Sequence, residues 1–198
     1  MPDIARLRGF VRSMTRLADE GADEARFLEE GAALLECLVR QDDWLPEDCA
    51  LAGPTYRQYL LHCDPLERFC VVSFVWGPGQ RTPIHDHTVW GLVGMLRGEE
   101  ISTEMLPGAP MRPGRVDRLR PGEVAKVSAA TYDIHVVENA LPDRASISIH
   151  VYGGNIGAVM RSVFDPETGA RKRFVSGYTN AAVPNLWDRS REMASAAA

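Results

Sequence analysis

The spacing of apolar residues changes near residue 50 of the chain. Before that point, apolar side chains recur every three or four residues, as they do on one face of an α-helix. Two such stripes are present: Ile4, Leu7, Val11, Met14 and Leu17, and then Phe27, Leu28, Leu34, Leu35 and Leu38. Gly21 separates the stripes, and Asp23 is placed to cap the second. We therefore predict two amphipathic helices whose apolar faces cover a core.

After residue 50 the apolar runs are short and lie between turn residues. Runs rich in β-branched and aromatic side chains predict strands. The predicted strands are 69–76, 90–96, 101–106, 115–119, 124–127 and 146–152, with a further strand-like segment at 132–137. Proline-glycine pairs at 107–108, 113–114 and 121–122 punctuate the series. Many short strands with regular turns are typical of a β-sandwich or a β-barrel.

These patterns divide the chain into three segments. A helical segment at 1–50 is expected to cover a barrel at 51–185, and 186–198 is expected to form a C-terminal tail that frays over its last six residues. The total of 198 residues fits one structural domain.

Composition excludes several classes of protein. The 22 basic and 27 acidic residues give a net charge of -5, which leaves no positive excess to neutralise the phosphates of a nucleic acid. No apolar run reaches the ~18 residues of a membrane span, and the first residues lack the apolar stretch of a secretory signal. The four cysteines include no C-x-x-C pair. We expect reduced thiols in a cytoplasmic protein that binds neither nucleic acid nor membrane.

Three histidines are candidate metal ligands. His85 and His87 are separated by one residue, so on a strand both imidazoles would point to the same face. His135 falls in the strand-like segment 132–137, which a barrel can bring alongside. Three imidazoles on one face suit iron, copper, nickel or zinc and leave positions open for other ligands. The alternative is a hydrogen-bonded histidine pair at the edge of a sheet.

The predicted strand 146–152 alternates polar and apolar residues. Ser146, Ser148, His150 and Tyr152 share one face, and isoleucine and valine occupy the other. Such a polar face usually meets solvent, but in a small barrel with an apolar outer layer it can line the lumen. Ser148, His150 and Tyr152 would then form a relay of hydroxyl, imidazole and phenol, which fixes the tautomer of the histidine and positions the phenol to donate a proton or a hydrogen bond. A Ser-His-Asp hydrolase is disfavoured because no G-x-S-x-G motif is present.

Together these motifs resemble the cupin superfamily over roughly residues 50–180. Gly79, His85-Asp86-His87 and then Gly98 are similar to the first cupin motif, and Gly122 through His135 to Asn139 is similar to a degenerate second motif. The resemblance implies a mainly β fold. The expected architecture is a small cupin barrel (a double-stranded β-helix, or jelly roll) with the N-terminal α-helices packed on it.

The predicted metal ligands are similar to those of one group within the cupin superfamily. Most cupins add a glutamate a few residues after the histidine pair, where this chain has Gly91 and Leu92. A site of three histidines resembles the thiol dioxygenases of the cysteine dioxygenase type. The runs 83–88 and 148–155 are also similar to theirs. This implies Fe(2+) held by His85, His87 and His135. It also implies a relay of Tyr152, His150 and Ser148, and a reaction that adds both atoms of O2 to a thiol sulfur.

Two differences between this sequence and that family bear on which substrate is bound. Mammalian-type enzymes have a cysteine after the histidine pair that is crosslinked to the relay tyrosine, so Gly91 and Leu92 predict no crosslink on Tyr152. Those enzymes also hold the amino acid carboxylate with an arginine two residues after a tyrosine. Here Tyr56 is followed by Gln58, which is similar to the bacterial branch that acts on 3-mercaptopropionate.

Another cation must then hold the carboxylate, because glutamine cannot form the charged bidentate pair that arginine forms. Arg161 matches the arginine of that branch, and Arg57 is the alternative if the alignment shifts by one residue. We expect the partners to be a small thiol carboxylate and O2, with L-cysteine as the alternative substrate. A non-catalytic metal-binding cupin that acts as a sensor is the alternative of a different class. Whether the chain is a monomer or a homo-oligomer stays open.

Overall fold

The computed structural model describes residues 4–128, 130–131 and 133–189. The helical elements are α1 (Ile4–Asp19), α2 (Glu24–Arg26), the π-helical turn η1 (Phe27–Gly31), α3 (Ala32–Val39) and the 3₁₀ turn η2 (Glu47–Cys49). The strands are β1 (Arg57–Cys63), β2 (Cys70–Trp76), β3 (Ile84–His85), β4 (Gly91–Arg97), β5 (Glu100–Leu106), β6 (Arg112–Leu119), β7 (Val124–Val127), β8 (His135–Asn139), β9 (Ser146–Tyr152), β10 (Arg161–Phe164) and β11 (Arg171–Phe174).

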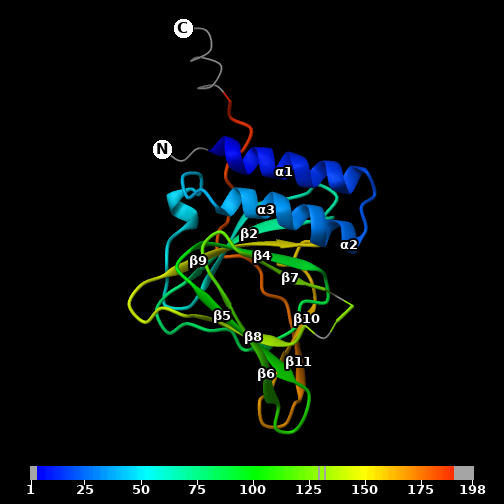
Figure 1. Ribbon diagram of the computed structural model, residues 1–198, viewed down its shortest axis with the longest axis vertical. Coiled ribbons are helices and arrows are strands. Elements are labelled where there is room, and N and C mark those ends of the chain that lie inside the picture. Colours follow the sequence, from blue (N-terminus) through cyan, green and yellow to red (C-terminus); the bar gives the residue numbers. More distant parts are fainter. Residues whose placement is uncertain (1–3, 129, 132, 190–198) are drawn as a thin grey trace.

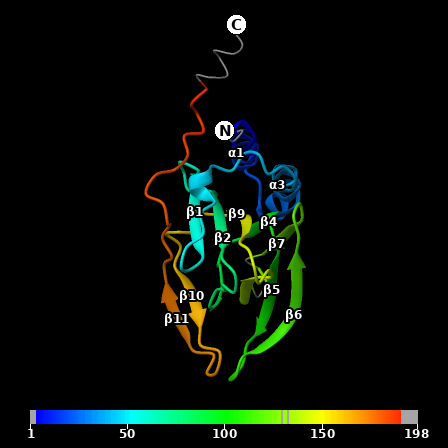
Figure 2. The ribbon, with the colours of Figure 1, turned by 90° about the vertical axis from the view of Figure 1, so that its left-hand side faces the viewer.

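The strands form two antiparallel sheets that face each other across a lumen (Figures 1 and 2). One sheet has the order β1-β2-β9-β4-β7 and the other has the order β11-β10-β3-β8-β5-β6. Neighbours in both sheets are far apart in sequence, as in β2-β9-β4 and β3-β8-β5, which is how a jelly roll alternates its strands between two sheets. The predicted fold class is confirmed: the protein is a mainly β, cupin-type double-stranded β-helix with N-terminal helices.

The helices cover the outer face of the five-stranded sheet. In Figure 1, α1 and α3 lie side by side against the sheet that contains β4 and β9. Their apolar stripes share one core with the outward side chains of the sheet, and Phe27 stacks on Trp90 with ring centroids 4.6 Å apart. Asp23 accepts a hydrogen bond from the backbone N–H of Arg26, so the predicted cap is confirmed. Periodicity located the second helix but not its π-helical turn.

Strand β9 lies in the middle of the five-stranded sheet and is buried on both faces. Its isoleucines and Val151 belong to the core beneath the helices. Ser148, His150 and Tyr152 therefore face the lumen, and all three are buried. Of the two expectations for this alternating strand, the lumen is correct and solvent is wrong, because the helices cover the other face.

The start of the C-terminal segment is held against α1. Leu186 is buried in the core beneath the helices, and its carbonyl accepts a hydrogen bond from Arg8 Nε at 2.9 Å. The segment expected to fray, 193–198, lies outside the described residues.

Strand boundaries differ from the prediction mainly at the six-stranded sheet. Strands β10 and β11 were not predicted, because they are short and rich in arginine, lysine and serine. Strand β1 of the five-stranded sheet was also not predicted, although it contains the apolar run Tyr59, Leu60 and Leu61. Strand β6 runs through Pro113 and Gly114, where a turn was expected. This strand lies at the edge of its sheet, where a proline does not remove a ladder hydrogen bond from a second neighbour.

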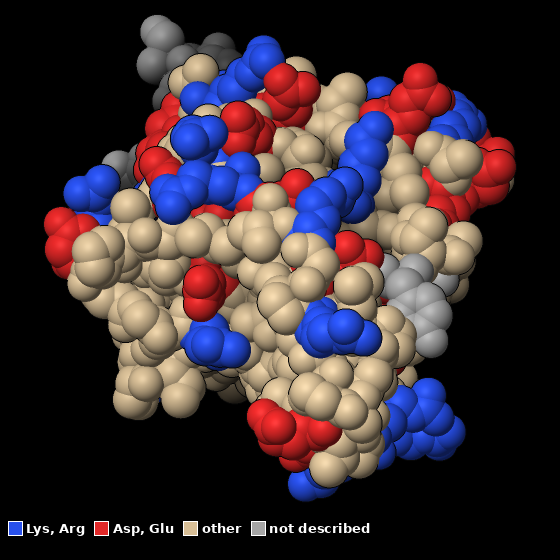
Figure 3. Space-filling model, turned by 60° about the horizontal axis from the view of Figure 1, so that its bottom comes forward, with Lys and Arg blue, Asp and Glu red and all other residues tan. Residues whose placement is uncertain are grey.

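The surface of the described residues carries mixed charge. On the face shown in Figure 3, acidic and basic side chains are interspersed. None of the described helices combines the length and the apolar character needed to cross a membrane.

Packing between α3 and β4 generates a prediction about stability. A Cβ at Gly94 would lie 2.9 Å from both Leu35 Cγ and Val39 Cγ1. We expect Gly94→Ala to lower the free energy of unfolding by ~1–3 kcal/mol, because the helix must move to make room. Urea denaturation measures the change.

Gly9 provides the matched control. It lies in α1, and a Cβ there would meet nothing within 4 Å. Gly9→Ala should therefore raise stability by ~0.5–1 kcal/mol, through the lower entropy of the unfolded chain. Equal stability of Gly94→Ala and the parent protein would contradict the close packing.

Candidate metal centre

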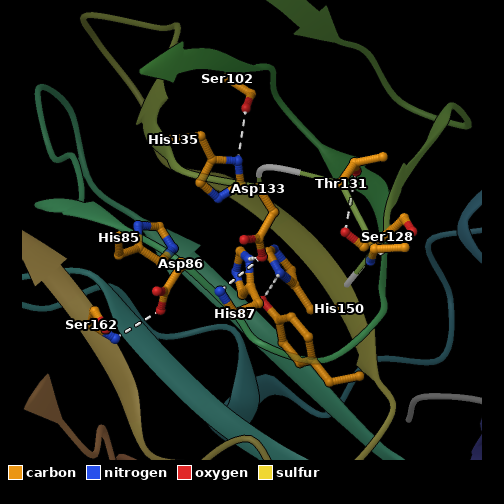
Figure 4. Close-up of polar contacts among 12 residues, drawn as sticks. His85, Asp86, His87, Ser102, Ser128, Thr131, Asp133, His135, His150 and Ser162 are labelled. Atoms are coloured by element: carbon orange, nitrogen blue, oxygen red, sulfur yellow. Dashed lines mark hydrogen bonds and ion pairs between the residues drawn. The ribbon is translucent and has the colours of Figure 1, made fainter. Parts of the chain in front are cut away.

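Three histidines meet in the lumen between the sheets. Strand β3 pairs with β8 so that His85 lies directly opposite His135. The ring centroids of His85, His87 and His135 are 4.8–5.0 Å apart, and one ligand nitrogen from each lies within 4.8 Å of the others (Figure 4). This is the spacing of a group that can hold one metal ion.

His87 reaches the cluster by a different route from the predicted one. Strand β3 ends at His85, so His87 does not share a strand face with it. The chain turns after His87, and Thr88 has a positive φ of 62°. Asp133 holds the bend by accepting hydrogen bonds from both the backbone N–H and Nδ1 of His87, at 2.8 and 3.1 Å. The expected convergence is present, but a carboxylate and a turn produce it.

Each histidine is anchored through its Nδ1 atom. His85 Nδ1 lies 3.1 Å from the carbonyl oxygen of Pro83, and His135 Nδ1 lies 3.3 Å from Ser102 Oγ. Together with the Asp133 contact, these bonds leave Nε2 of each ring for the centre of the cluster. His135 Nε2 is buried without a hydrogen-bond partner among the described residues, which is costly unless a ligand takes it up. The donor set and its anchoring therefore fit a metal ion.

Electrostatics favour the neutral, metal-binding form of these rings. Burial first, and the neighbouring histidines second, hold the pKa values of His85 and His87 well below their usual range. Burial also lowers the pKa of His135 to about 4. Protons therefore compete with a metal ion only in acid, well below neutral pH. The metal-binding group in the described part of the chain contains no carboxylate or thiol.

A hydrogen-bonded chain runs along β9 beside the cluster. His150 Nδ1 lies 2.8 Å from the hydroxyl of Tyr152, and His150 Nε2 lies 2.8 Å from Ser148 Oγ. The Tyr152 ring stacks on His87 with centroids 5.2 Å apart. Burial lowers the pKa of His150 to about 3 and raises that of Tyr152, so both side chains stay neutral across the physiological range. The structure thus brings the relay residues into contact with each other and with the cluster.

The surroundings of Tyr152 bear on the expected absence of a crosslink. Gly91 is its cross-strand neighbour on β4, and a Cβ there would lie 3.1 Å from the ring. Cys70 is its neighbour on β2, but burial raises the pKa of that thiol to about 11. A tyrosine without a crosslink stays a prediction.

A cavity of about 250 Å³ leads to the three histidines. Its lining includes Arg161, Gln58 and Tyr56, together with the relay residues His150 and Tyr152. The cavity therefore brings all the predicted substrate-binding residues to the same space.

Arg161 is a buried cation in that cavity. It is 5% exposed, its Nη2 donates to Ser176 Oγ at 2.8 Å, and its guanidinium lies 4.8 Å from the centroid of the Phe174 ring. Its Nε is buried without a partner among the described residues. A buried guanidinium held by a hydroxyl and an aromatic ring attracts an anion, because its charge is otherwise uncompensated.

Gln58 and Arg57 take opposite sides of β1. Gln58 lines the cavity and donates its Nε2 to the carbonyl of Gly177 at 2.8 Å. Tyr56 stacks on Trp76 at 5.0 Å between ring centroids. Arg57 does not line the cavity, and its guanidinium packs against Gly53. The alignment that uses Gln58 therefore agrees with the geometry, and the alternative that uses Arg57 does not.

Sequence reasoning missed three residues around the cluster. Asp133 and Ser102 anchor two of the clustered histidines, and Glu100 is buried near the relay. Asp133 precedes His135 by two residues, which is a weak signal, and the other two depend on the register of β5 against β8. A second, wider cleft of about 1010 Å³ also reaches His135, from the side of β5, β6 and β7.

No protein-family model matches this sequence. An uncharacterized conserved protein from Klebsiella pneumoniae subsp. pneumoniae MGH 78578 with a double-stranded beta-helix domain is 19% identical, and the match covers 55% of this chain and 87% of that one at a TM-score of 0.45. A cupin superfamily protein from Desulfitobacterium hafniense DCB-2 is 15% identical, with 58% and 94% covered at 0.43. A cupin-like protein from Thermotoga maritima msb8 is 22% identical, with 52% and 74% covered at 0.39. These likenesses are partial, and they cover between 52% and 58% of this chain.

The contact between Asp133 and His87 generates a prediction about metal affinity. We expect Asp133→Asn to weaken metal binding by ~10–100-fold, because the amide keeps an acceptor for His87 but loses the charge that orients and polarises the ring. Competition against a chelating indicator measures the dissociation constant. Asp143→Asn, which changes an exposed carboxylate, is the control and should leave the affinity unchanged. Equal affinities of the two variants would exclude an anchoring role for Asp133.

Proposed function

We propose that this protein is an iron-dependent thiol dioxygenase that converts a small thiol carboxylate and O2 to the sulfinic acid. The favoured substrate is 3-mercaptopropionate, which would give 3-sulfinopropionate. The observation that carries the proposal is the convergence on one cavity of three anchored histidines, a tyrosine relay and a buried arginine whose Nε has no partner among the described residues.

The three histidines supply the proposed metal site. His85, His87 and His135 would hold Fe(2+) through neutral nitrogens and leave neighbouring positions free for two further ligands. When bound, the iron would supply the redox chemistry that lets O2 react with sulfur. The thiol itself provides the electrons, so the reaction needs no organic cofactor and no external reductant.

The protein's own groups would bind and orient the thiol. A carboxylate on the guanidinium of Arg161 would neutralise its buried charge and direct the other end of a short substrate towards the histidines. Tyr152, oriented by His150, would hydrogen-bond the sulfur or the incoming oxygen. The apolar walls formed by Phe74, Trp76 and Val137 would keep water away from the reacting atoms.

Gln58 is the proposed selector between the two candidate thiols. Its amide is tied to Gly177, so it presents a neutral side chain where an arginine would present a second cation. A substrate with a single carboxylate and no ammonium group matches a cavity that contains one buried arginine. L-Cysteine is the alternative substrate, and the same chemistry would give cysteine sulfinate. A non-catalytic metal-binding sensor remains the alternative of a different class.

Arg161 generates the prediction that tests the substrate class. We expect iron-loaded protein to consume O2 with 3-mercaptopropionate and to form one sulfinate per O2. Arg161→Gln should raise KM for this thiol by ~10–100-fold, because a charged hydrogen bond is lost, and should change the weaker turnover of 2-mercaptoethanol little. Arg173→Gln, an exposed arginine on β11, is the control. No O2 uptake with either 3-mercaptopropionate or L-cysteine would refute the dioxygenase and favour the sensor.

Gln58 generates a separate prediction about specificity. Gln58→Arg should raise kcat/KM for L-cysteine relative to 3-mercaptopropionate by ~10-fold or more, because a second cation becomes available to the amino acid carboxylate. Gln41→Arg adds the same charge at an exposed position and should leave the ratio unchanged. An unchanged ratio in Gln58→Arg would show that Gln58 is not the selector.

A further inference from the structure

A buried carboxyl group lies at the far end of the relay from Tyr152. Glu100, the first residue of β5, is 2% exposed. Its Oε1 is buried without a hydrogen-bond partner among the described residues. A carboxylate in such a place is costly, whereas a neutral carboxylic acid is tolerated. Burial raises the pKa of Glu100 to about 8, an effect that hydrogen bonding to Ser148 and Trp76 partly offsets.

Ser148 connects this carboxyl group to the relay. Its Oγ contacts His150 Nε2 at 2.8 Å, accepts a hydrogen bond from Trp76 Nε1 at 3.3 Å and lies within hydrogen-bonding reach of Glu100. A hydroxyl has one proton to donate and two lone pairs that accept. Since the tryptophan N–H can only donate, Ser148 has one donor and one acceptor role left to divide between Glu100 and His150.

That division allows two complete arrangements. With Glu100 protonated, its O–H donates to Ser148, and Ser148 donates to His150 Nε2. His150 Nδ1–H then donates to the Tyr152 oxygen, which leaves the Tyr152 O–H free to donate to a ligand in the cavity. With Glu100 ionised, every bond reverses, so that Ser148 donates to Glu100, His150 Nε2–H donates to Ser148, and the Tyr152 O–H donates to His150 Nδ1. The tyrosine then has only lone pairs to offer the cavity.

We infer that Glu100 is a positioning residue whose ionisation sets the direction of the Ser148-His150-Tyr152 relay and which receives the proton that the thiol loses on binding. The second part of this inference rests on the proposed function, and the first part does not. His150 stays neutral in both arrangements, so it responds by exchanging tautomers and not by gaining charge.

The proton transfer balances along the chain. The thiol S–H gives its proton to the Tyr152 oxygen, whose own proton moves to His150 Nδ1. The Nε2 proton of His150 moves to Ser148 Oγ, and the Ser148 proton moves to the Glu100 carboxylate. The products are a thiolate that accepts a hydrogen bond from Tyr152 and a protonated Glu100. One proton has crossed the relay, and neither electrons nor a further reactant are needed.

The surroundings of Glu100 include a route by which its proton can reach solvent. Glu100 lines the wider cleft of about 1010 Å³ and does not line the substrate cavity. Among the described residues, the charge of Glu100 acts on Tyr152 of β9 and His135 of β8 lines the same cleft, whereas Trp76 on β2 and Leu119 on β6 carry no titratable group. The charged side chains that line the cleft are Glu29, Glu36, Glu104, Arg115, Asp117, Arg118, Glu123, Lys126 and Asp133.

The tautomer of His150 tests the direction of the relay directly. We expect ¹⁵N NMR of the full-length, zinc-loaded protein to show His150 protonated on Nδ1 below the pKa of Glu100 and on Nε2 above it, with the signal identified by its loss in His150→Gln. Glu100→Gln should hold His150 in one tautomer at every pH, because an amide hydrogen-bonds Ser148 but does not ionise. Glu104→Gln, on the same strand and in the same cleft, is the matched control and should titrate as the parent does.

Kinetics test the transfer of the thiol proton. As pH rises, Glu100 ionises and can accept, so kcat/KM of the parent should rise up to about pH 8. Glu100→Gln should lose that rise and fall ~10²-fold below the parent on the alkaline side, with its metal affinity unchanged. An alkaline rise that persists in Glu100→Gln would overturn the proton-accepting role.

Two further outcomes keep the inference separate from the proposed function. If His150 holds one tautomer throughout the titration of the parent, or exchanges identically in Glu100→Gln, the inference is wrong even if the protein oxidises thiols. If the exchange depends on Glu100 but no thiol is oxidised, the inferred relay direction is correct and the proposed function is wrong.

Ser148→Ala should break the connection between Glu100 and His150. The carboxylic acid carbonyl band of Glu100 would still titrate in infrared spectra while His150 no longer responds.

Discussion

Strand β9 is buried on both of its faces, and the organisation of the site depends on that constraint. The N-terminal helices cover one face, so the strand's alternation forces its polar residues into the lumen. Polar groups that are buried in this way must find partners within the protein. Ser148, His150 and Tyr152 satisfy one another, which converts a packing requirement into an ordered chain of hydrogen bonds.

The sequence revealed features that depend on local periodicity and composition. The limits of β7 and β9 were predicted to the residue, and the apolar stripes located the helices, because both faces of each element have distinct environments. The histidine pair pointed to the metal centre for a partly wrong reason, since His87 lies beyond the end of β3. Its place depends on Asp133, forty-six residues away, and no local pattern encodes such a contact.

Electrostatic features were the least accessible to sequence reasoning. Nothing in the spacing of residues indicates that Arg161 is buried on an aromatic ring or that Glu100 reaches the relay. The first follows from the pairing of β10 with β11, in which Arg161 lies opposite Phe174, and the second follows from the packing of the two sheets, which places β5 beside β9. The result is a lumen of neutral imidazoles and phenols, with the buried Arg161 at the cavity and the buried carboxyl group of Glu100 behind the relay. Arg161 can therefore attract an anionic substrate, and Glu100 can bind or release a proton, at separate places in the barrel.

The histidine cluster and the Ser148-His150-Tyr152 relay are built mainly on different sheets. His85 and His135 come from β3 and β8 of the six-stranded sheet, whereas the relay is built on β9 of the five-stranded sheet. Each set is held by contacts within its own sheet and the adjoining loops, so a slight parting of the sheets would disturb neither internally. It would change the gap at which Tyr152 stacks on His87 and the contact between Ser148 on β9 and Glu100 on β5. The separation of the two sheets therefore determines how closely the relay approaches the histidine cluster. The packing of the helices on the outer face helps to fix that separation.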